Sequence, residues 1–336
     1  MNKYLQLQPK GHQSGMGLVE IMVALVIGLV ASLVIFQTLR DAGHRAAVTT
    51  TGGDVQTSGA LGMYYLERDA RLAGWGFAAQ DSETGAIDAV NCNTGTLNML
   101  PVVVSQGAAN ASDSVTVMYG SSARFTGAGT YTGAGTSIAT RQRPGFIVGD
   151  QVLLVGTGNC VLTTVSAVVG STGLTLAAAA PTNGSIYNLG PTPVRQEWRV
   201  DARGLQSRQF NWAGNAFGAD NTVADDVVAM QARYFVGNAC VDAAPANWRQ
   251  VEGLCVALLL RSKHFDKDYQ APAITFNLPA WAASWVADFG LLNPDGSAYS
   301  CPGTGVSADP AKGCNYRYEV FSKVVPLRNL VWGNAI

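Results

Sequence analysis

An acidic side chain at the start of an apolar segment is the first feature of this chain that points to chemistry. Glu20 comes directly before residues 21–36, which are apolar except for Gly28 and Ser32. A carboxylate at mid-membrane costs about 2.5–3.5 kcal/mol, so a charge in such a run normally has a function. Glu20 is therefore the first candidate functional residue, and it requires a cationic partner.

Two common N-terminal signals share this pattern but leave Glu20 unexplained. A secretory signal peptide also has a basic start, here Lys3 and Lys10, and an apolar core. However, the apolar run is at or beyond the long end of such a core, and no A-x-A cleavage site follows it. A plain signal anchor fits the length, because about 20 residues span a bilayer. It gives no role to the carboxylate.

The residues around Glu20 match a third kind of signal. The string K-G-H-Q-S-G-M-G-L-V-E-I-M-V-A-L-V-I-G-L-V, residues 10–30, resembles the class III signal of type IV prepilins. The resemblance implies that a prepilin peptidase in the membrane cuts after Gly15 and methylates the new amine on Met16, a variant of the usual phenylalanine. Glu20 is then fifth after the cut, where the family has a glutamate. We expect Glu20 to act in subunit assembly by pairing with the Met16 amine of a neighbouring subunit.

Charges and cysteines orient the apolar segment. Lys3 and Lys10 precede it, and positive residues stay cytoplasmic, although Arg40 and Arg45 on the other side weaken this argument. All six cysteines lie beyond the segment, and disulfides need an oxidising compartment. The prediction is a single pass through the inner membrane with the C-terminal domain in the periplasm. From the resemblance, the chain then enters an extracellular pilus, at its tip.

The cysteines predict disulfides and not a metal site. They are Cys92, Cys160, Cys240, Cys255, Cys301 and Cys314. None forms C-x-x-C, and no histidine stands near them at metal-ligand spacing, so no metal is expected. Six cysteines allow fifteen connectivities. Short loops favour Cys240–Cys255 and Cys301–Cys314. That leaves Cys92–Cys160, and the run D-Q-V-L-L-V-G-T-G-N-C that ends at Cys160 resembles a half-cystine site in pilin relatives.

A long helix is predicted from the apolar segment onward. Apolar residues continue at helical spacing, so residues 17–72 would form one helix about 85 Å long at 1.5 Å per residue. Gly52 and Gly53 are expected to bend or open it, and Gly74 and Gly76 to end it. Such a helix needs neighbouring helices along its apolar half.

From about Phe77 the pattern is that of short strands separated by Gly, Asn and Ser. Strands are predicted at residues 114–119, 151–155, 160–168, 173–176, 227–236, 254–261 and 318–325. Residues 197–201 and 205–212 flank a short turn and are typical of a hairpin. The glycine-rich run at residues 127–135 is expected to be a flexible loop, because it lacks the strand-to-helix context of a phosphate-binding loop.

These elements predict an α+β, pilin-like fold. A long N-terminal helix, half in the membrane and half soluble, packs on an antiparallel β-rich globular domain with disulfides. The predicted boundaries are residues 1–15 for the leader, 16–39 for the transmembrane half of the helix, 40–76 for its soluble half, and 77–336 for the globular domain.

Two further segments narrow the family resemblance. The string Y-Y-L-E-R-D-A-R-L-A-G-W-G, residues 64–76, and parts of residues 227–329 resemble PilW-like minor pilins, which share their plan with J-type minor pseudopilins of type II secretion. The resemblance implies a minor pilin that primes pilus assembly and sits in the tip complex. Its partners would be other minor pilins, the major pilin, the inner-membrane assembly machinery and membrane lipid.

Two alternatives stay open. One is a minor pseudopilin of type II secretion, which shares the same plan. The other is a pilin-anchored adhesin, because residues 93–180 match the family only loosely and could form a Gly/Thr-rich insert that contacts a receptor.

Composition and the residue inventory argue against catalysis and nucleic-acid binding. Charged residues make up 13% of the chain and the formal net charge is −1, so no basic excess favours nucleic acid. His264 is the one histidine in the globular part and no nucleophile motif accompanies it, which disfavours a tethered hydrolase. Asp266 with Asp268, and Asp295 with Ser297, lack the ligand series of a calcium loop. No enzymatic activity, cofactor or metal is expected.

Overall fold

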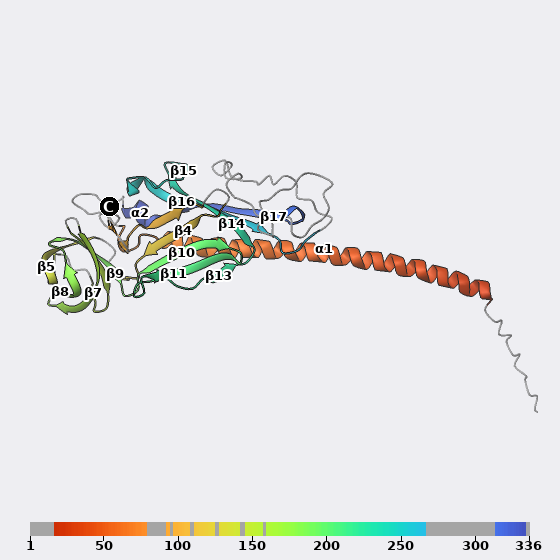
Figure 1. Cartoon of the computed structure of the whole chain (residues 1–336), viewed down its shortest axis with the longest axis horizontal. Helices are drawn as coiled ribbons and strands as arrows, with labels where there is room; N and C mark the ends of the chain where they lie inside the picture. Colours follow the sequence, from red (N-terminus) through yellow and green to blue (C-terminus); the bar gives the residue numbers. More distant parts are fainter. Residues whose placement is uncertain are drawn as a thin grey trace, which may run out of the picture. The chain divides into compact units, whose positions relative to one another are not determined.

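A long helix followed by antiparallel strands makes up this chain (Figure 1). The computed structural model describes residues 17–78, 92–94, 97–107, 111–124, 128–141, 145–156, 159–266 and 313–333. The chain divides into two compact units, Met1–Thr50 and Thr51–Ile336. The predicted fold class, a long N-terminal helix with an antiparallel β-rich domain and disulfides, is confirmed.

Helix α1, Leu18–Leu72, is continuous over 55 residues. It runs unbroken through Gly52 and Gly53, so the expected opening there is wrong. Each glycine costs only about 1 kcal/mol relative to alanine, which a long hydrogen-bond ladder tolerates. The nearby Thr57 hydroxyl also donates to the Gly53 carbonyl at 2.9 Å.

The end of α1 is set by two glycines, as predicted. Gly74 and Gly76 have φ values of +81° and +88°, a conformation that side chains with a Cβ rarely adopt. The Gly74 amide donates to the Met118 carbonyl at 2.8 Å, which fixes where the chain turns away. The helix itself ends at Leu72, slightly before the predicted boundary at residue 76.

The first sheet is antiparallel and has six strands. They are β3 (Val102–Ser105), β4 (Ser114–Tyr119), β10 (Val194–Asp201), β11 (Gly204–Asn211), β12 (Ala216–Phe217) and β13 (Asn221–Ala224). Their order is β12-β11-β10-β4-β3, with β13 also paired to β11. The predicted hairpin is β10–β11, closed by the pair Asp201 and Gly204, and is confirmed.

The second sheet is also antiparallel and has four strands. In spatial order they are β15 (Ala239–Val241), β14 (Val227–Val236), β16 (Val251–Arg261) and β17 (Tyr318–Pro326). Short helices η2 (Trp248–Gln250), η4 (Gly313–Asn315) and α2 (Arg328–Gly333) flank them. Strands β1 (Asn93–Thr94) and β2 (Leu97–Asn98) form a separate small pair.

A five-stranded closed barrel completes the fold. Its strands are β5 (Gly129–Thr140), β6 (Gln151–Gly156), β7 (Asn159–Val169), β8 (Gly173–Ala180) and β9 (Gly184–Gly190). They close in the order β5-β8-β7-β6-β9. The barrel has its own apolar core, which includes Tyr131, Val152, Leu154 and Ile186.

The glycine-rich run at residues 127–135 is not a loop, so that expectation is wrong. Most of it lies in β5, where Tyr131 is buried and its hydroxyl donates to the Pro181 carbonyl at 2.8 Å. Gly133 and Gly135 have positive φ, and the pairing register shifts just after Gly135. The glycines therefore bend a strand around the barrel, a use of glycine that looks like loop composition in a sequence.

The boundaries of the expected insert also change. The adhesin alternative treats residues 93–180 as one insert, but β3 and β4 within that range belong to the six-stranded sheet. The barrel instead lies between β4 and β10, which pair directly with Tyr119 opposite Val194. The insert thus begins after Tyr119 and ends before Val194.

The main core joins α1 to both sheets. Val55, Met63 and Leu66 of α1 share one buried apolar cluster with residues of the six-stranded and four-stranded sheets, among them Trp198 and Leu258. Two helix glycines allow this close approach: a Cβ on Gly59 would collide with the Phe321 ring, and one on Gly62 would lie 3.0 Å from Leu205.

A buried ion pair ties the two sheets together. Asp113 and Arg233 have side chains that are 2% and 7% exposed, and their charged groups lie 2.9 Å apart. The Asp113 carboxylate also accepts the amides of Gly107 at 2.8 Å and Ala232 at 2.9 Å. Arg233 contacts Asp242 as well. Because Asp113 precedes β4 and Arg233 lies on β14, this network fixes one sheet to the other.

Candidate functional site

The structure places Glu20 in the first turn of α1, exposed. The backbone N–H of Glu20 donates to the Gly17 carbonyl at 2.9 Å. The unpaired N–H groups of a helix start carry partial positive charge, so a carboxylate is favourable here. Gly15 and Met16 lie outside the described residues, and the pairing of Glu20 with a Met16 amine stays a prediction.

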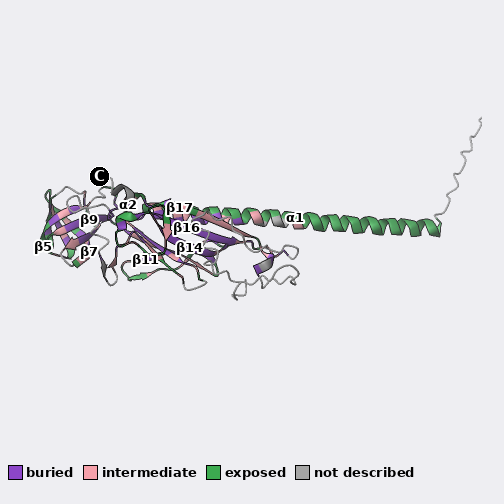
Figure 2. Ribbon diagram, turned by 90° about the horizontal axis from the view of Figure 1, so that it is seen from above, coloured by how far each residue is buried: buried purple, intermediate pink, exposed green. Residues whose placement is uncertain are grey.

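The apolar part of α1 is exposed all round. Every residue from 17 to 43 is exposed in the chain alone, including Leu18 at 75% and Phe36 at 69% (Figure 2). The stretch Leu18–Ala46 is long and apolar enough to cross a membrane. Together with the motif at its start, it is a membrane anchor that precedes a soluble C-terminal domain. A surface this apolar requires cover from lipid or from other helices.

Two hydroxyl groups in the anchor are satisfied within the helix. The Ser32 hydroxyl donates to the Gly28 carbonyl at 2.7 Å, and the Thr38 hydroxyl donates to the Ile35 carbonyl at 2.9 Å. This arrangement suits surroundings that offer no hydrogen bonds. Ala24, Gly28 and Ser32 also recur at four-residue spacing, the pattern that lets helices approach closely in membranes. This four-residue spacing of small side chains is visible in the sequence, but an inspection of hydropathy and charge alone does not detect it.

The soluble end of α1 is held by the C-terminal part of the chain. Lys323 on β17 donates to Glu67 at 2.8 Å, and Arg71 contacts the same carboxylate. The hydrogen bond from Lys323 and both positive charges lower the pKa of Glu67, against the opposing effect of burial. The Asn329 side-chain amide donates to the carbonyls of Arg71, Leu72 and Ala73 at 3.3, 3.1 and 3.0 Å. Asn329 thus caps the end of a helix that lies 256–258 residues earlier in the chain, a contact that only the tertiary fold creates.

Replacement of Asn329 by alanine should weaken this attachment. The last carbonyls of α1 would lose their partner, and the expected loss of unfolding free energy is about 1–2 kcal/mol. Urea denaturation followed by tryptophan fluorescence would measure it. Asn221→Ala, at an exposed position on β13, is the matched control and should change stability little. Equal stability of the two variants would contradict the capping role.

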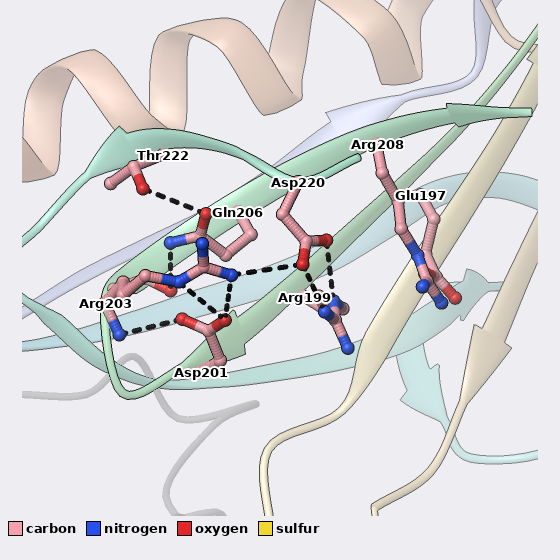
Figure 3. Close-up of polar contacts among 9 residues, drawn as sticks. Glu197, Arg199, Asp201, Arg203, Gln206, Arg208, Asp220 and Thr222 are labelled. Carbon is pink, nitrogen blue, oxygen red and sulfur yellow. Dashed lines mark hydrogen bonds and ion pairs between the residues drawn. The ribbon is translucent and has the colours of Figure 1, made fainter. Parts of the chain in front are cut away.

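A network of charges covers the β10–β11 hairpin (Figure 3). Arg199 and Arg203 both reach Asp220, at 2.6 and 3.1 Å, and Arg203 also bonds Asp201 at 2.9 Å. The hydrogen bond from Arg199 lowers the pKa of Asp220. A similar pair, Arg208 with Glu197, lies across the two strands. Each of these acids faces an arginine, so the network holds the hairpin and the start of β13 and offers no general base.

Among the residues considered for catalysis or calcium, Asp266 has an ion-pair partner, and His264 takes part in a contact through its backbone. The His264 carbonyl accepts from the Ser262 hydroxyl at 3.3 Å. Asp266 is 5% exposed and pairs with Arg317 at 3.5 Å. Asp268, Asp295 and Ser297 lie outside the described residues. Within the described ranges, no group of three or more His, Cys, Asp or Glu side chains could hold a metal ion. The absence of metal, cofactor and catalysis stays a prediction.

Two disulfides are present, with the pairings that were expected. Cys92 forms a disulfide with Cys160 on β7, and Cys240 forms one with Cys255. The Cα–Cα distances are 5.7 Å and 6.1 Å. The second bridge joins β15 and β16, which flank β14. Cys301 and the side chain of Cys314 lie outside the described residues, so their pairing stays a prediction.

Comparisons with known proteins point to the N-terminus. Residues 10–36 match the prokaryotic N-terminal methylation motif. No curated protein matches the chain significantly. A similar solved structure is that of a type IV-like pilin from Thermus thermophilus, with 13% identity, a TM-score of 0.38, and coverage of 82% of this chain and 96% of that chain. This similarity is too low to transfer that protein's role. The chain is therefore one that carries a prepilin-type N-terminal methylation motif at the start of a long apolar helix.

Proposed function

We propose that this chain is a minor pilin of the PilW type, a structural and non-catalytic subunit that primes type IV pilus assembly and lies in the tip complex. One observation carries the proposal. The methylation motif at residues 10–36 leads into a helix whose apolar half is exposed all round, with Glu20 in its first turn. A helix of this kind is stable either in lipid or among the helices of a filament.

In this proposal the leader is removed before assembly. A prepilin peptidase cuts after Gly15 and methylates Met16, and the mature chain waits in the inner membrane with its β-rich domain in the periplasm. The assembly machinery then withdraws residues 16–39 from lipid into the filament. There the major pilin and other minor pilins replace lipid around the helix, and the domain reaches the extracellular tip.

Glu20 provides the register between subunits. A secondary amine on Met16 of a neighbour is protonated near neutral pH. At about 4 Å and an effective dielectric near 20, the pair is worth up to about 4 kcal/mol before desolvation. Pairing also removes the penalty of an unpartnered charge in the apolar filament core.

Glu20→Ala tests this role. The variant should be cleaved, methylated and retained in the membrane. Its ratio to the major pilin in sheared pili should fall about tenfold or more, since 1.4 kcal/mol already corresponds to a factor of ten. Quantitative blots of membrane and sheared fractions measure the ratio. Asp41→Ala, an exposed acid further along α1, is the control. Incorporation of Glu20→Ala at the wild-type ratio would mean that Glu20 merely reaches the headgroup boundary.

An adhesin is the second candidate, and the barrel favours it. The barrel has a separate core and is inserted between two paired strands, so it could carry a receptor site without disturbing the sheet. Replacement of the barrel by a short turn, with Cys92→Ser to avoid a free thiol, should preserve piliation and abolish attachment in this case. Normal attachment after the replacement would exclude the barrel as the receptor site.

A further inference from the structure

A pocket of about 570 Å³ lies between α1 and the six-stranded sheet. Its wall on the helix runs from Leu61 to Asp69, and strands β4, β10, β11 and β13 supply the opposite wall. The rings of Tyr65, Tyr119 and Trp198 line it. The volume is within the range of about 300–1,000 Å³ that is usual for small-molecule sites.

One buried polar group that lines this pocket lacks a hydrogen-bond partner. Trp198 is 2% exposed, and its indole N–H is buried with no acceptor in hydrogen-bonding geometry. The indole lies near enough to Asp69 to favour the charged carboxylate, but it does not complete a bond to it. A buried donor in this state costs about 1–3 kcal/mol.

Three neutral side chains elsewhere in the pocket lining are also available to bind. Among the hydrogen bonds of the described residues, none uses the side chains of Gln196, Ser207 or Gln209, which line the same pocket. The amides and the hydroxyl can both donate and accept. The pocket therefore offers a set of uncharged hydrogen-bonding groups next to aromatic rings.

The charges at the pocket compensate each other. Asp69 is 3% exposed, and the Arg68 guanidinium pairs with its carboxylate at 3.0 Å. The same guanidinium lies 5.2 Å from the centre of the Tyr65 ring. Burial raises the pKa of Asp69, an effect that Arg68 partly offsets. Burial and the nearby Asp69 raise the pKa of Tyr119 to about 12, so its hydroxyl keeps its proton. A charged ligand would therefore find no unpaired charge of opposite sign on Arg68 or Asp69.

The geometry also argues against an extended peptide. Such peptides gain affinity by adding a strand to a free sheet edge. Strand β4 pairs with both β3 and β10, and β10 pairs with both β4 and β11. Both strands are therefore internal, and their backbone groups are committed to the sheet.

We propose that this pocket binds a neutral saccharide. Such a ligand has hydroxyl groups that can accept from Trp198 and exchange hydrogen bonds with Gln196 and Gln209. It also has an apolar ring face that can pack on Tyr65 and Tyr119. At the rim of the pocket, the Thr222 hydroxyl donates to the Gln206 side chain at 3.0 Å, which steadies β13 against β11 (Figure 3).

The test is direct binding to the mature full-length chain in a detergent that contains no sugar. The probes are the methyl glycosides of glucose, galactose and N-acetylglucosamine, with maltose and lactose. Glucosamine and glucuronate are the charged comparators. Saturation-transfer NMR detects binding and calorimetry measures it. At least one neutral sugar should bind, and Trp198→Phe, which keeps a ring and removes the N–H, should weaken it about tenfold.

Two further variants keep the test decisive if Trp198→Phe folds poorly. Gln209→Ala alters an exposed rim position and should also weaken binding. Tyr64→Phe, on the same helix but outside the pocket lining, should leave the affinity unchanged. The proposal is overturned if no neutral sugar binds, if Gln209→Ala binds as wild type does, or if a charged comparator or a pilin peptide binds in preference. Because the measurement needs no pilus, such a failure leaves the assembly role untouched.

Discussion

Gly15→Val is expected to leave the whole population of the chain as uncleaved precursor in the membrane. The resemblance to prepilins implies a peptidase that needs a small residue before the cut, and a β-branched side chain at this position would block it. The wild-type chain should instead begin at N-methylated Met16. Mass spectrometry of intact protein from the membrane fraction distinguishes the two products.

The leader offers its own control for this experiment. Gly11→Val makes the same substitution four residues earlier, away from the cut, and should be processed normally. A wild-type chain with an intact leader, or one cut elsewhere, would overturn the prepilin assignment. Precursor that accumulates with both variants would instead indicate a general defect of the altered leader.

Asp113→Ala should have the largest effect on stability within the β-rich unit. It would leave the Arg233 guanidinium buried without its Asp113 partner and deprive two backbone amides of their acceptor. Breaking a buried pair in this way costs about 3–5 kcal/mol. Urea and thermal denaturation of the mature chain would measure the loss. Asp242 contacts the same arginine from an exposed position and should compensate only in part.

A surface pair supplies the comparison. Asp225 binds Lys263, and both side chains are more than half exposed, so Asp225→Ala should cost at most about 1 kcal/mol. A double variant, Asp113→Leu with Arg233→Met, should recover part of the stability, because it removes both buried charges but still leaves the amides of Gly107 and Ala232 without the Asp113 acceptor. If Asp113→Ala and Asp225→Ala were equally stable, the buried pair would not hold the sheets together.

Features that depend on local pattern could be predicted from the sequence. Strands β4 and β14 have the predicted bounds, and the β10–β11 hairpin lies where expected. Helix α1 follows from its periodicity and from the glycines that end it. Each of these depends on residues close together in the chain, where spacing and turn chemistry carry the information.

Features that depend on distant contacts could not be predicted. Strand β5 is rich in glycine and acquires its strand character only by closing the barrel. Asn329 gains its role from the carbonyls at the end of α1. In the sequence Asp69 looks like an ordinary polar residue of a helix, and only the folded structure places Trp198 and Tyr119 in the same pocket. The sequence shows no periodicity that would bring these residues together.

The direct pairing of Tyr119 with Val194 has a consequence for the order of folding. Closing a loop of about 70 residues costs roughly 2.5 kcal/mol more than closing a four-residue turn, by the (3/2)RT ln n rule. Most of this loop-closure cost is already met if the barrel folds first, because its strand pairs are closer in sequence. The pair Gly129–Ile186 then holds the two ends of the insert near each other. Completion of the six-stranded sheet would then wait for the barrel, and mutations that slow barrel closure would slow the appearance of the whole β-rich unit.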